Sequence, residues 1–282
     1  TATTFAASLA AYYEKIPVGH VEAGLRTEDI YSPWPEEGNR KLTGALAGYH
    51  FAPTETSKKN LLAENVDPGK IFVTGNTVID ALLKVVESIE SNNELQKQLK
   101  TNYPFIDETK RLVVVTGHRR ENFGEGFVNF CLALKTIADQ YPDWILVYPV
   151  HLNPNVQKPV FEMLGECPNI HLIEPQDYLP FIWLLDKCDL VITDSGGIQE
   201  EAPSLGKPVI VTREVTERPE AVEAGTVVLV GTTTDKIIDT TVSILTDQEK
   251  YRSMSSAHNP YGDGTASNQI LAALTLSHEL KE

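Results

Sequence analysis

Short, continuous apolar runs alternate along the chain with longer segments in which apolar residues recur every three or four positions. The runs predict buried strands, and the longer segments predict helices that bury one face. In the first part of the chain the pattern predicts helices at residues 1–15, 39–47, 54–65 and 78–90, and strands at residues 16–21, 49–53 and 71–74. A polar segment with Pro104 follows at residues 91–110 and predicts a domain boundary.

A second series of the same kind begins at residue 111. Strands are predicted at residues 111–116, 144–150, 170–173, 190–193, 208–212 and 227–230. Helices are predicted at residues 126–140, 235–245 and 267–280, with two shorter helices that end at residue 187 and before Gly206. Strands that alternate with helices predict parallel sheets with helices on both faces, and therefore an α/β fold.

The stretch from residue 189 to residue 220 has the clearest chemistry. A buried strand leads into Ser195, Gly196 and Gly197, and a short helix with Glu201 follows. Adjacent glycines let the backbone approach a ligand, and a helix start offers free N–H groups and a positive dipole end that suit phosphate. Glu201 lies one turn into this helix, where its carboxylate can accept the hydroxyls of a ribose.

Two cations follow the next strand in the same stretch. Arg213 and Arg218 are placed to meet a diphosphate as it arrives or departs. Together with the glycine turn and Glu201, they predict a cradle for a nucleoside diphosphate. Strand–turn–helix units with glycine at the turn also occur for packing reasons, so the turn without its neighbours would predict little.

Composition limits the classes of partner. The chain of 282 residues has 24 Lys and Arg against 39 Asp and Glu, a formal net charge of -15. This acidity opposes binding to nucleic acid or to an anionic membrane surface. Cys131, Cys167 and Cys188 are too scattered for a disulfide framework or a zinc site, and we expect buried thiols of a cytoplasmic protein. No apolar run is long enough for a membrane span, and His118 with Glu121 is too sparse a pair for a metal site, so neither is expected.

Three side chains are candidates for proton transfer. Glu22 follows a predicted strand, Glu36 lies in a loop fixed by two prolines, and His118 follows the first strand of the second series. Carboxylates and an imidazole around one cleft can remove a proton and return it. The alternative is that Glu22 and Glu36 are structural and pair with Arg26 and Arg40.

Two further groups are candidates for binding. The densest cationic patch of the chain consists of His118, Arg119 and Arg120, and it predicts anion binding. His151 is expected as a neighbour because it follows the adjacent strand. The alternative is that the patch is a solvated turn. Gln176 and Phe181 flank a proline-bounded loop before the cradle and can bond and stack a base, although Phe181 is otherwise a core residue.

Taken together, the motifs of the chain resemble those of bacterial non-hydrolysing UDP-N-acetylglucosamine 2-epimerases. The matching segments are GHVEAGLRT, SPWPEEGNR, PTETS, GNTVIDAL, TGHRREN, YPVHLNPNV, DSGGIQEEAPSLGKPV, TERPEAV and NPYGDG. The resemblance implies two Rossmann-like domains in the glycosyltransferase-B arrangement. It divides the chain into the remainder of the first domain (1–106), a UDP-binding domain (107–264) and a terminal helix that packs back on the first domain (265–282).

The implied reaction interconverts UDP-N-acetylglucosamine and UDP-N-acetylmannosamine. It eliminates UDP to give a 2-acetamidoglucal and adds UDP back, and it supplies N-acetylmannosamine for cell-surface polysaccharides. The resemblance implies that the enzyme needs no cofactor and that it forms a homodimer. Glu22, Glu36 and His118 match the family's acid/base residues. A second UDP-N-acetylglucosamine acts as activator in bacterial members, at positions matched by Arg119 and His151. The implied UDP contacts are Gln176, Phe181, Ser195, Gly196, Gly197, Glu201 and Arg218.

The front of the chain departs from the family pattern. Family members begin with about another half-domain, which ends in a Gly-Asp-Thr motif, and this sequence opens at that threonine. We therefore expect a catalytic aspartate just before Thr1 and a first sheet with an exposed edge. The alternatives left open are a glycosyltransferase of the same fold, a hydrolysing 2-epimerase that releases free N-acetylmannosamine, and a binding module without turnover.

Overall fold

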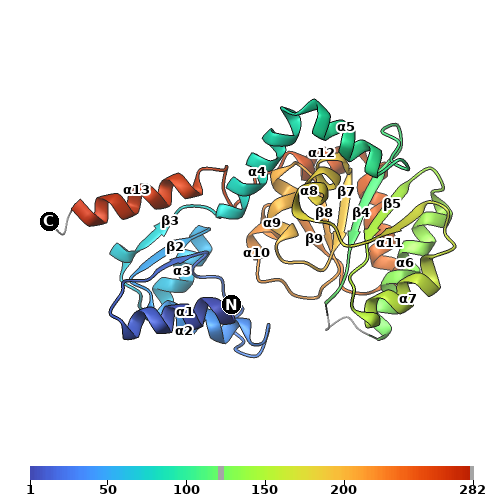
Figure 1. Ribbon diagram of the computed structural model, residues 1–282. Helices are drawn as coiled ribbons and strands as arrows, with labels where there is room; N and C mark the ends of the chain where they lie inside the picture. The colour runs from blue at the N-terminus through green and yellow to red at the C-terminus, as the bar shows by residue number, and fades with distance from the viewer. Residues whose placement is uncertain (120–123, 280–282) are drawn as a thin grey trace. The chain divides into compact units, whose positions relative to one another are not determined.

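Parallel strands alternate with helices throughout the computed structural model, which describes residues 1–119 and 124–279 (Figure 1). Two units can be recognised: one comprises Thr1–Leu83 and Pro260–Glu282, and the other comprises Lys84–Asn259. We call them unit 1 and unit 2. The predicted α/β class with two Rossmann-like units is confirmed. The domain boundaries proposed after residues 106 and 264 stay a prediction.

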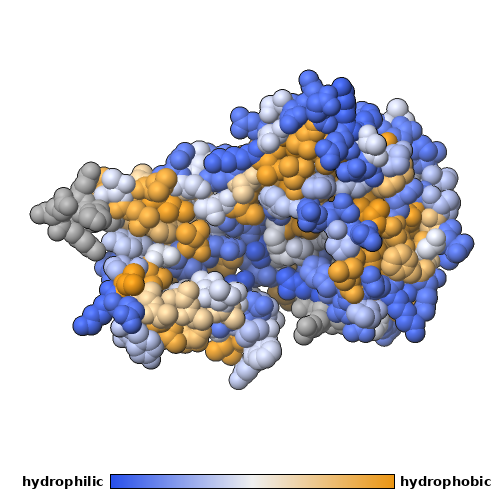
Figure 2. Space-filling view, in the orientation of Figure 1, coloured by the Kyte–Doolittle hydropathy of each residue, from blue (hydrophilic) through white to orange (hydrophobic). Residues whose placement is uncertain are grey.

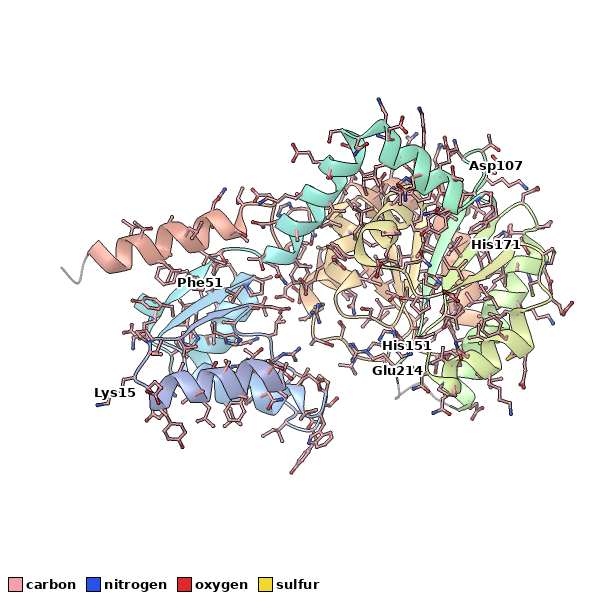
Figure 3. The ribbon with its side chains drawn as sticks, in the orientation of Figure 1. Lys15, Phe51, Asp107, His151, His171 and Glu214 are labelled. Atoms are coloured by element: carbon pink, nitrogen blue, oxygen red, sulfur yellow. The ribbon has the colours of Figure 1, made fainter. Side chains whose placement is uncertain are left out.

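Unit 1 contains a three-stranded parallel sheet in the order β1-β2-β3. Its elements are α1 (Ala2–Tyr13), β1 (Gly19–Val21), α2 (Glu36–Leu46), β2 (Tyr49–Ala52), α3 (Glu55–Ala63), a 3-10 turn (Pro68–Lys70), β3 (Ile71–Val73), the start of α4 (Thr77–Glu90) and α13 (Ala266–Glu279). Successive side chains of a strand point to opposite faces. Phe51 accordingly packs with Ile270 of α13, while Ala52 packs with Leu61 of α3 (Figure 3). The sheet therefore has a small core on each face.

Unit 2 contains a six-stranded parallel sheet in the order β6-β5-β4-β7-β8-β9. Its strands are β4 (Leu112–Thr116), β5 (Ile145–Pro149), β6 (Ile170–Ile173), β7 (Leu190–Thr193), β8 (Val209–Val211) and β9 (Val227–Leu229). Counted within the unit, this is the Rossmann-type order 3-2-1-4-5-6. The order reverses between β4 and β7, and the carboxyl ends of those two strands mark the place where such sheets bind ligands.

Helices cover both faces of the larger sheet. They are α5 (Asn93–Asn102), α6 (Glu125–Gln140), α7 (Pro154–Leu164), α8 (Tyr178–Lys187), α9 (Ile198–Ser204), α10 (Pro219–Glu223), α11 (Thr234–Thr246) and α12 (Gln248–Ser255). The main core lies between the sheet and the layer formed by α6, α7 and α11, and it includes Val113, Val115 and Ile192 of the central strands. Figure 1 shows this layer beside the sheet. Because the central strands are buried on both sides, β4 and β7 are apolar up to the threonine that ends each of them.

Several expectations from the sequence need correction. Glu36 lies in the first turn of α2, not in the preceding loop, because the helix begins directly after Pro35 rather than at Asn39. The polar segment at residues 91–110 contains α5, which buries Leu99 but has too few apolar positions to be recognised. The predicted end of the last helix at residue 280 lies outside the described residues, as do Arg120 and Glu121.

The predicted state of the cysteines is confirmed. Cys131, Cys167 and Cys188 are all free and buried. Burial raises the pKa of the Cys131 and Cys188 thiols to about 12. None of the helices in the described part of the chain has the length and apolar character required to cross a bilayer. The described residues also contain no cluster of three or more metal-binding side chains.

Candidate functional site

The turn between β7 and α9 is shaped by its glycines. Thr193 ends β7, and its Oγ1 accepts the backbone N–H of Ser195 at 2.9 Å. A Cβ at Gly196 would lie 2.5 Å from Nη1 of Arg218, whereas a Cβ at Gly197 would meet no atom closer than 3.9 Å. Gly196 therefore leaves the space in which the Arg218 guanidinium lies against the turn. The predicted phosphate-binding backbone and the predicted arginine are thus neighbours.

Glu201 lies one turn into α9 and is buried. The hydroxyl of Tyr178 donates a hydrogen bond to its Oε1 at 2.9 Å. Burial raises the pKa of Glu201, while the bond from Tyr178 acts in the opposite direction. Tyr178 therefore orients the carboxylate and favours its charged form, and an ionised carboxylate is an acceptor for hydroxyl groups.

The two arginines beyond β8 take part in a buried ion-pair cluster. Arg218 Nε lies 2.5 Å from Glu200 Oε1, and Arg218 Nη1 lies 3.1 Å from Glu217 Oε1. Arg213 Nη1 lies 2.9 Å from Glu217 Oε2, and Arg119 Nη2 lies 4.0 Å from Glu217 Oε1. Burial would raise the pKa of Glu217, but Arg218 and Arg213 outweigh it and lower that pKa to about 2. The cluster therefore brings three guanidinium groups to one place, and guanidinium groups bind phosphate oxygens well.

The loop after β4 is held by Asp194, the first residue after β7. Oδ2 of this buried carboxylate accepts the backbone N–H groups of His118 and Arg119, each at 2.8 Å. The His118 ring stacks on His151, with centroids 5.3 Å apart. Burial lowers the pKa of His118, Asp194 acts to raise it, and His151 and Arg119 lower it further. The structure therefore brings His118, Arg119 and His151 together at the switch point of the sheet, as the strand ends predict.

The predicted base-binding loop is anchored by an aromatic residue from outside the cradle. Gln176 Oε1 accepts a hydrogen bond from the Tyr103 hydroxyl at 2.6 Å, and its Nε2 donates to the carbonyl of Glu174 at 2.6 Å. Tyr103 is buried and stacks on Trp183, with centroids 5.3 Å apart. Phe181 is partly buried on α8. The amide of Gln176 is therefore fixed by protein contacts at both ends, and its role toward a base stays a prediction.

Glu22 and Glu36 belong to unit 1. Glu22 follows β1 with a φ of 63°, a left-handed conformation that is uncommon for residues other than glycine and that occurs often at functional sites. It lines a hollow of about 150 Å³ with polar walls that also include His20 and Arg40. Glu36 is partly buried in the first turn of α2. All the other predicted site residues belong to unit 2.

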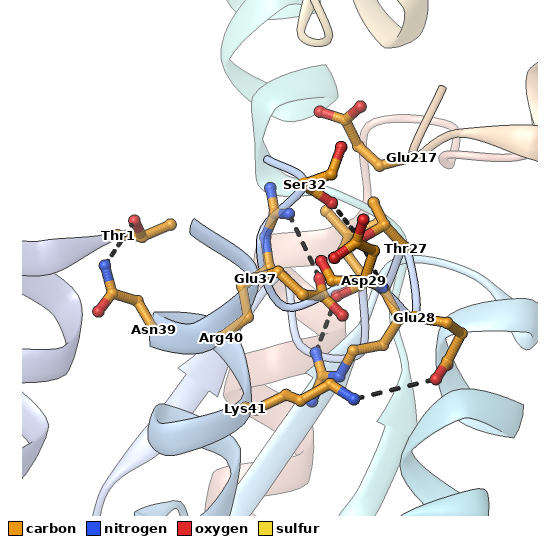
Figure 4. Close-up of polar contacts among 12 residues, drawn as sticks. Thr1, Thr27, Glu28, Asp29, Ser32, Glu37, Asn39, Arg40, Lys41 and Glu217 are labelled. Carbon is orange, nitrogen blue, oxygen red and sulfur yellow. Dashed lines mark hydrogen bonds and ion pairs between the residues drawn. The ribbon is translucent and has the colours of Figure 1, made fainter. Parts of the chain in front are cut away.

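The arginines considered as structural partners of these glutamates pair with other carboxylates. Arg26 Nη2 lies 2.7 Å from Glu64 Oε2, and Arg40 Nη1 lies 3.9 Å from the buried Glu37. Figure 4 shows the contact of Arg40 with Glu37 at the start of α2. Arg26 and Arg40 thus each have a carboxylate partner, and both the catalytic and the structural interpretation of Glu22 and Glu36 stay predictions.

Comparison with known proteins identifies the family. The UDP-N-acetylglucosamine 2-epimerase family matches residues 1–275. The chain belongs to the UDP-N-acetylglucosamine 2-epimerase family. The predicted family and enzyme class are thereby confirmed. Among curated relatives, the UDP-N-acetylglucosamine 2-epimerase of Escherichia coli K12 is 62% identical over 274 residues, which are 97% of this chain and 73% of the relative.

Solved epimerase structures share the fold of this epimerase-family chain. The UDP-GlcNAc 2-epimerase from Neisseria meningitidis bound to UDP-GlcNAc has a TM-score of 0.94 and 54% identity, and the match covers 98% of this chain and 74% of that one. The enzyme from Methanocaldococcus jannaschii in complex with UDP-GlcNAc and UDP has a TM-score of 0.82 and 37% identity, with coverage of 98% and 74%.

Three side chains that hold the predicted residues of this family member in place were missed from the sequence. Tyr178 bonds Glu201, Tyr103 bonds Gln176, and Asp194 bonds the loop of His118. Only Asp194 had a recognisable local signature, because it directly follows a strand and precedes the glycine turn. The partners of the two tyrosines depend on the tertiary fold.

Proposed function

We propose that this chain contains the site of a non-hydrolysing epimerase that interconverts UDP-N-acetylglucosamine and UDP-N-acetylmannosamine. The observation that carries the proposal is the convergence at the switch point of unit 2. There the glycine turn, the carboxylate of Glu201 and the guanidinium of Arg218 lie after the carboxyl ends of neighbouring parallel strands. Relatives with the same fold are described as bound to UDP-GlcNAc and UDP, which supports the same ligand class here.

In this proposal unit 2 binds the UDP group. The turn at Ser195, Gly196 and Gly197 and the guanidinium of Arg218 hold the diphosphate, because backbone N–H groups at a helix start and an arginine both bind phosphate oxygens. Glu201 accepts the ribose hydroxyls. Gln176 and Phe181 hold the uracil by hydrogen bonding and stacking.

The chemistry follows from the substrate. The proton on C2 is not adjacent to a carbonyl carbon, so its direct removal and return is unfavourable. Elimination avoids this problem: a base takes the C2 proton, the C–H electrons form the C1–C2 double bond, and the C1–O bond breaks with its electrons going to UDP. UDP then adds back at C1 while C2 takes a proton on the other face. Glu22, Glu36 and His118 supply the acid and base groups that these two steps need.

Further parts of the proposal rest on the family. The product supplies N-acetylmannosamine units for cell-surface polysaccharides, and the protein works in the cytoplasm as a homodimer. A second UDP-N-acetylglucosamine acts as activator through Arg119 and His151. The stacking of His151 on His118 supports this placement, because a ligand that binds His151 would also contact the catalytic candidate.

The deciding experiment is incubation with UDP-N-acetylglucosamine alone in heavy water. We expect deuterium at C2 of both UDP-sugars, read by proton NMR, without free sugar. Free N-acetylmannosamine would indicate the hydrolysing reaction, and no exchange in the absence of an acceptor would indicate a glycosyltransferase. Binding of UDP by calorimetry without any turnover would indicate a binding module.

A substitution tests the role of Glu22. We expect Glu22→Gln to retain UDP binding by calorimetry and to lose C2 exchange by about 100-fold or more, because a general base typically contributes this much. Glu28→Gln is the matched control, since Glu28 is an exposed glutamate of the same region that also has a positive φ, of 65°. It pairs loosely with Lys41 at 3.9 Å and should leave exchange unchanged (Figure 4). Equal losses of binding and exchange in Glu22→Gln would contradict the role.

A further inference from the structure

The two carboxylate oxygens of Asp194 have different surroundings. Asp194 is 1% exposed, and its Oδ2 accepts two backbone N–H groups of the loop after β4. Its Oδ1 is buried and has no hydrogen-bond partner among residues 1–119 and 124–276. Nδ1 of His118 lies 3.5 Å from Oδ1. A buried carboxylate oxygen without a donor is costly, so this geometry requires an explanation.

We propose that Asp194 is the positioning residue for His118: Oδ1 accepts the Nδ1–H of the imidazole, so that Nε2 is the atom presented to the ligand. The inference rests on the acid/base role proposed above for His118. It adds a residue and a protonation pattern to that site. A separation of 3.5 Å is long for a hydrogen bond, and such contacts commonly shorten when the ligand binds.

The fold gives Asp194 the position for both tasks. β4 and β7 are adjacent parallel strands, with Thr116 opposite Thr193, so the residues that follow each strand are neighbours. Oδ2 fixes the backbone of His118 and Arg119, and Oδ1 then faces the His118 ring from a fixed distance. One carboxylate thus sets both the place of the loop and the orientation of its imidazole. A carboxylate beside Nδ1 also selects the tautomer with the proton on Nδ1.

The charges around His118 explain why the pairing matters. Three influences lower its pKa, namely burial, His151 and Arg119, and Asp194 is the group that opposes them. If Asp194 lost its charge, the remaining influences would all disfavour the imidazolium form. Asp194 therefore favours the imidazolium form, which is the form that a group returning a proton must adopt.

The first test uses the unaltered protein. Nitrogen chemical shifts of the His118 ring in the labelled protein report which nitrogen is protonated above the pKa. We expect the Nδ1–H tautomer. The Nε2–H tautomer, which is the commoner form of free histidine, would overturn the proposal. This measurement requires neither a variant nor enzymatic activity.

The second test is Asp194→Asn. Asparagine keeps an oxygen that can accept the two backbone N–H bonds, so the loop should remain in place, but it lacks the negative charge. We expect the NMR-measured pKa of His118 to fall by about one unit or more, because an opposite charge at this distance shifts a pKa by that amount. C2 exchange at pH 7 should fall by about 100-fold, the range of general acid–base effects, while the Kd for UDP changes less than about threefold.

Asp189→Asn is the matched control for this variant. Asp189 precedes β7 at its other end, accepts the backbone N–H of Leu112 at 2.8 Å and pairs with Arg111 at 2.6 Å. It therefore also combines a backbone N–H bond with a cationic side-chain partner, but it has no contact with His118. We expect the His118 titration and C2 exchange to stay as in the unaltered protein. A fall of the His118 pKa in both variants would overturn the proposal, because the effect would then not depend on the Asp194 contact.

The readouts separate this inference from the proposed function. If Asp194→Asn is folded and the His118 pKa does not fall, the pairing is refuted. If the pKa falls and C2 exchange is unaffected, the positioning role is refuted. If the unaltered protein exchanges no deuterium at all, the proposed function fails, and the tautomer and titration still decide whether Asp194 orients His118.

Discussion

At the scale of single residues, the two glycines of the turn after β7 differ in what they permit. A Cβ at Gly196 would collide with the Arg218 guanidinium and lie 3.2 Å from Glu217 Oε1. A Cβ at Gly197 would lie 3.9 Å from Glu201 Oε2, an ordinary van der Waals distance. We expect Gly196→Ala to displace the guanidinium and to lower the free energy of unfolding by about 1–3 kcal/mol, as for an overpacked site. Urea denaturation without ligand measures the loss.

Gly197→Ala is the control for this prediction. Gly197 has helical backbone angles, with φ of -62° and ψ of -40°, that alanine adopts without strain. We therefore expect unchanged or slightly higher stability, by up to about 1 kcal/mol from the lower entropy of the unfolded chain. Equal losses in the two variants would show that the contact with Arg218 does not set the requirement for glycine.

Tyr178 provides a test of the carboxylate of Glu201. We expect Tyr178→Phe to weaken UDP binding about fivefold, because one hydrogen bond contributes about 1 kcal/mol. The bond from Tyr178 lowers the pKa of Glu201, so its loss raises that pKa. If ionised Glu201 binds the ribose, the affinity for UDP should fall as the solution is acidified. This fall should begin at a higher pH in Tyr178→Phe than in the unaltered protein. Calorimetric titration with UDP between pH 5 and pH 8 measures this shift.

Tyr103→Phe separates the pH effect from a general weakening. Tyr103 bonds Gln176, an amide that does not titrate. We expect this variant to lose affinity for UDP by a similar factor at every pH. A shifted pH dependence in Tyr103→Phe, or an unshifted one in Tyr178→Phe, would contradict the assignment.

These contacts also show what a sequence can predict at this scale. Glu201 was predicted because it is four residues from Gly197 on one helix, a local relation. His151 was expected near His118 because both follow strands of one parallel sheet. The bond between Tyr103 and Gln176 joins residues 73 positions apart, and no local pattern in the sequence indicates it. Residues that orient others are therefore harder to predict than the residues they orient.

At the scale of elements, the alternation of apolar runs and helices predicts most strands of unit 2 but not their order. The pairing of β4 with β7 joins segments 77 residues apart and skips two intervening strands. This pairing creates the switch point, and with it the site. The four missed helices have a different cause. α5 and α12 bury one residue each, α7 contains an internal proline, and α10 has only five residues. Tertiary contacts stabilise such helices more than their own sequence does.

The start of α13 depends on a residue of α4. Asp80 is buried, and its two oxygens accept the backbone N–H groups of Ala266 and Ser267 at 3.1 and 2.8 Å. A carboxylate at a helix start also interacts favourably with the helix dipole. We expect Asp80→Ala to destabilise unit 1 by about 2 kcal/mol. Amide hydrogen exchange in α13 should then accelerate more than tenfold, as measured by mass spectrometry of its peptides.

Asp247→Ala is the matched control. Asp247 also accepts two backbone N–H groups, at 2.9 and 3.1 Å, but it is exposed and begins α12 of unit 2. Exchange should accelerate in α12 and stay unchanged in α13. If Asp80→Ala leaves α13 as protected as before, the capping contact does not hold this helix on the sheet.

At the scale of the whole molecule, the two units differ in how well they bury their apolar residues. Unit 2 contains an extended core cluster and further fully buried residues such as Val114 and Leu184, whereas unit 1 has small clusters on each face of a three-stranded sheet. Unit 1 also exposes large apolar side chains, among them Tyr13 of α1 and Leu271 and Leu276 of α13. Figure 2 shows hydrophobic residues at the surface of α1 and α13.

The units also contain different buried titratable groups. In unit 1, burial together with His50, Arg26 and Arg40 lowers the pKa of His20 to about 4. In unit 2, the pKa of Glu217 is about 2 because Arg218 and Arg213 outweigh its burial. Both pKa values are lower in the folded state than in the unfolded chain. Each group therefore contributes stability that is complete above its unfolded pKa and is lost as the pH falls through its folded pKa.

These two pH ranges predict that, as the pH is lowered, unit 1 loses stability before unit 2 does. Stability linked to His20 should decline between about pH 6.5 and pH 4, and stability linked to Glu217 between about pH 4.5 and pH 2, each by about 3 kcal/mol at 1.4 kcal/mol per pKa unit. Hydrogen exchange of β2 and β7 as a function of pH measures the units separately. His20→Asn should remove most of the first decline and Glu217→Gln most of the second, since neither replacement titrates. If the amides of β2 are as protected at pH 4.5 as at pH 8, the link between His20 and acid stability is contradicted. Such a result would mean that protonation of the buried His20 does not destabilise unit 1.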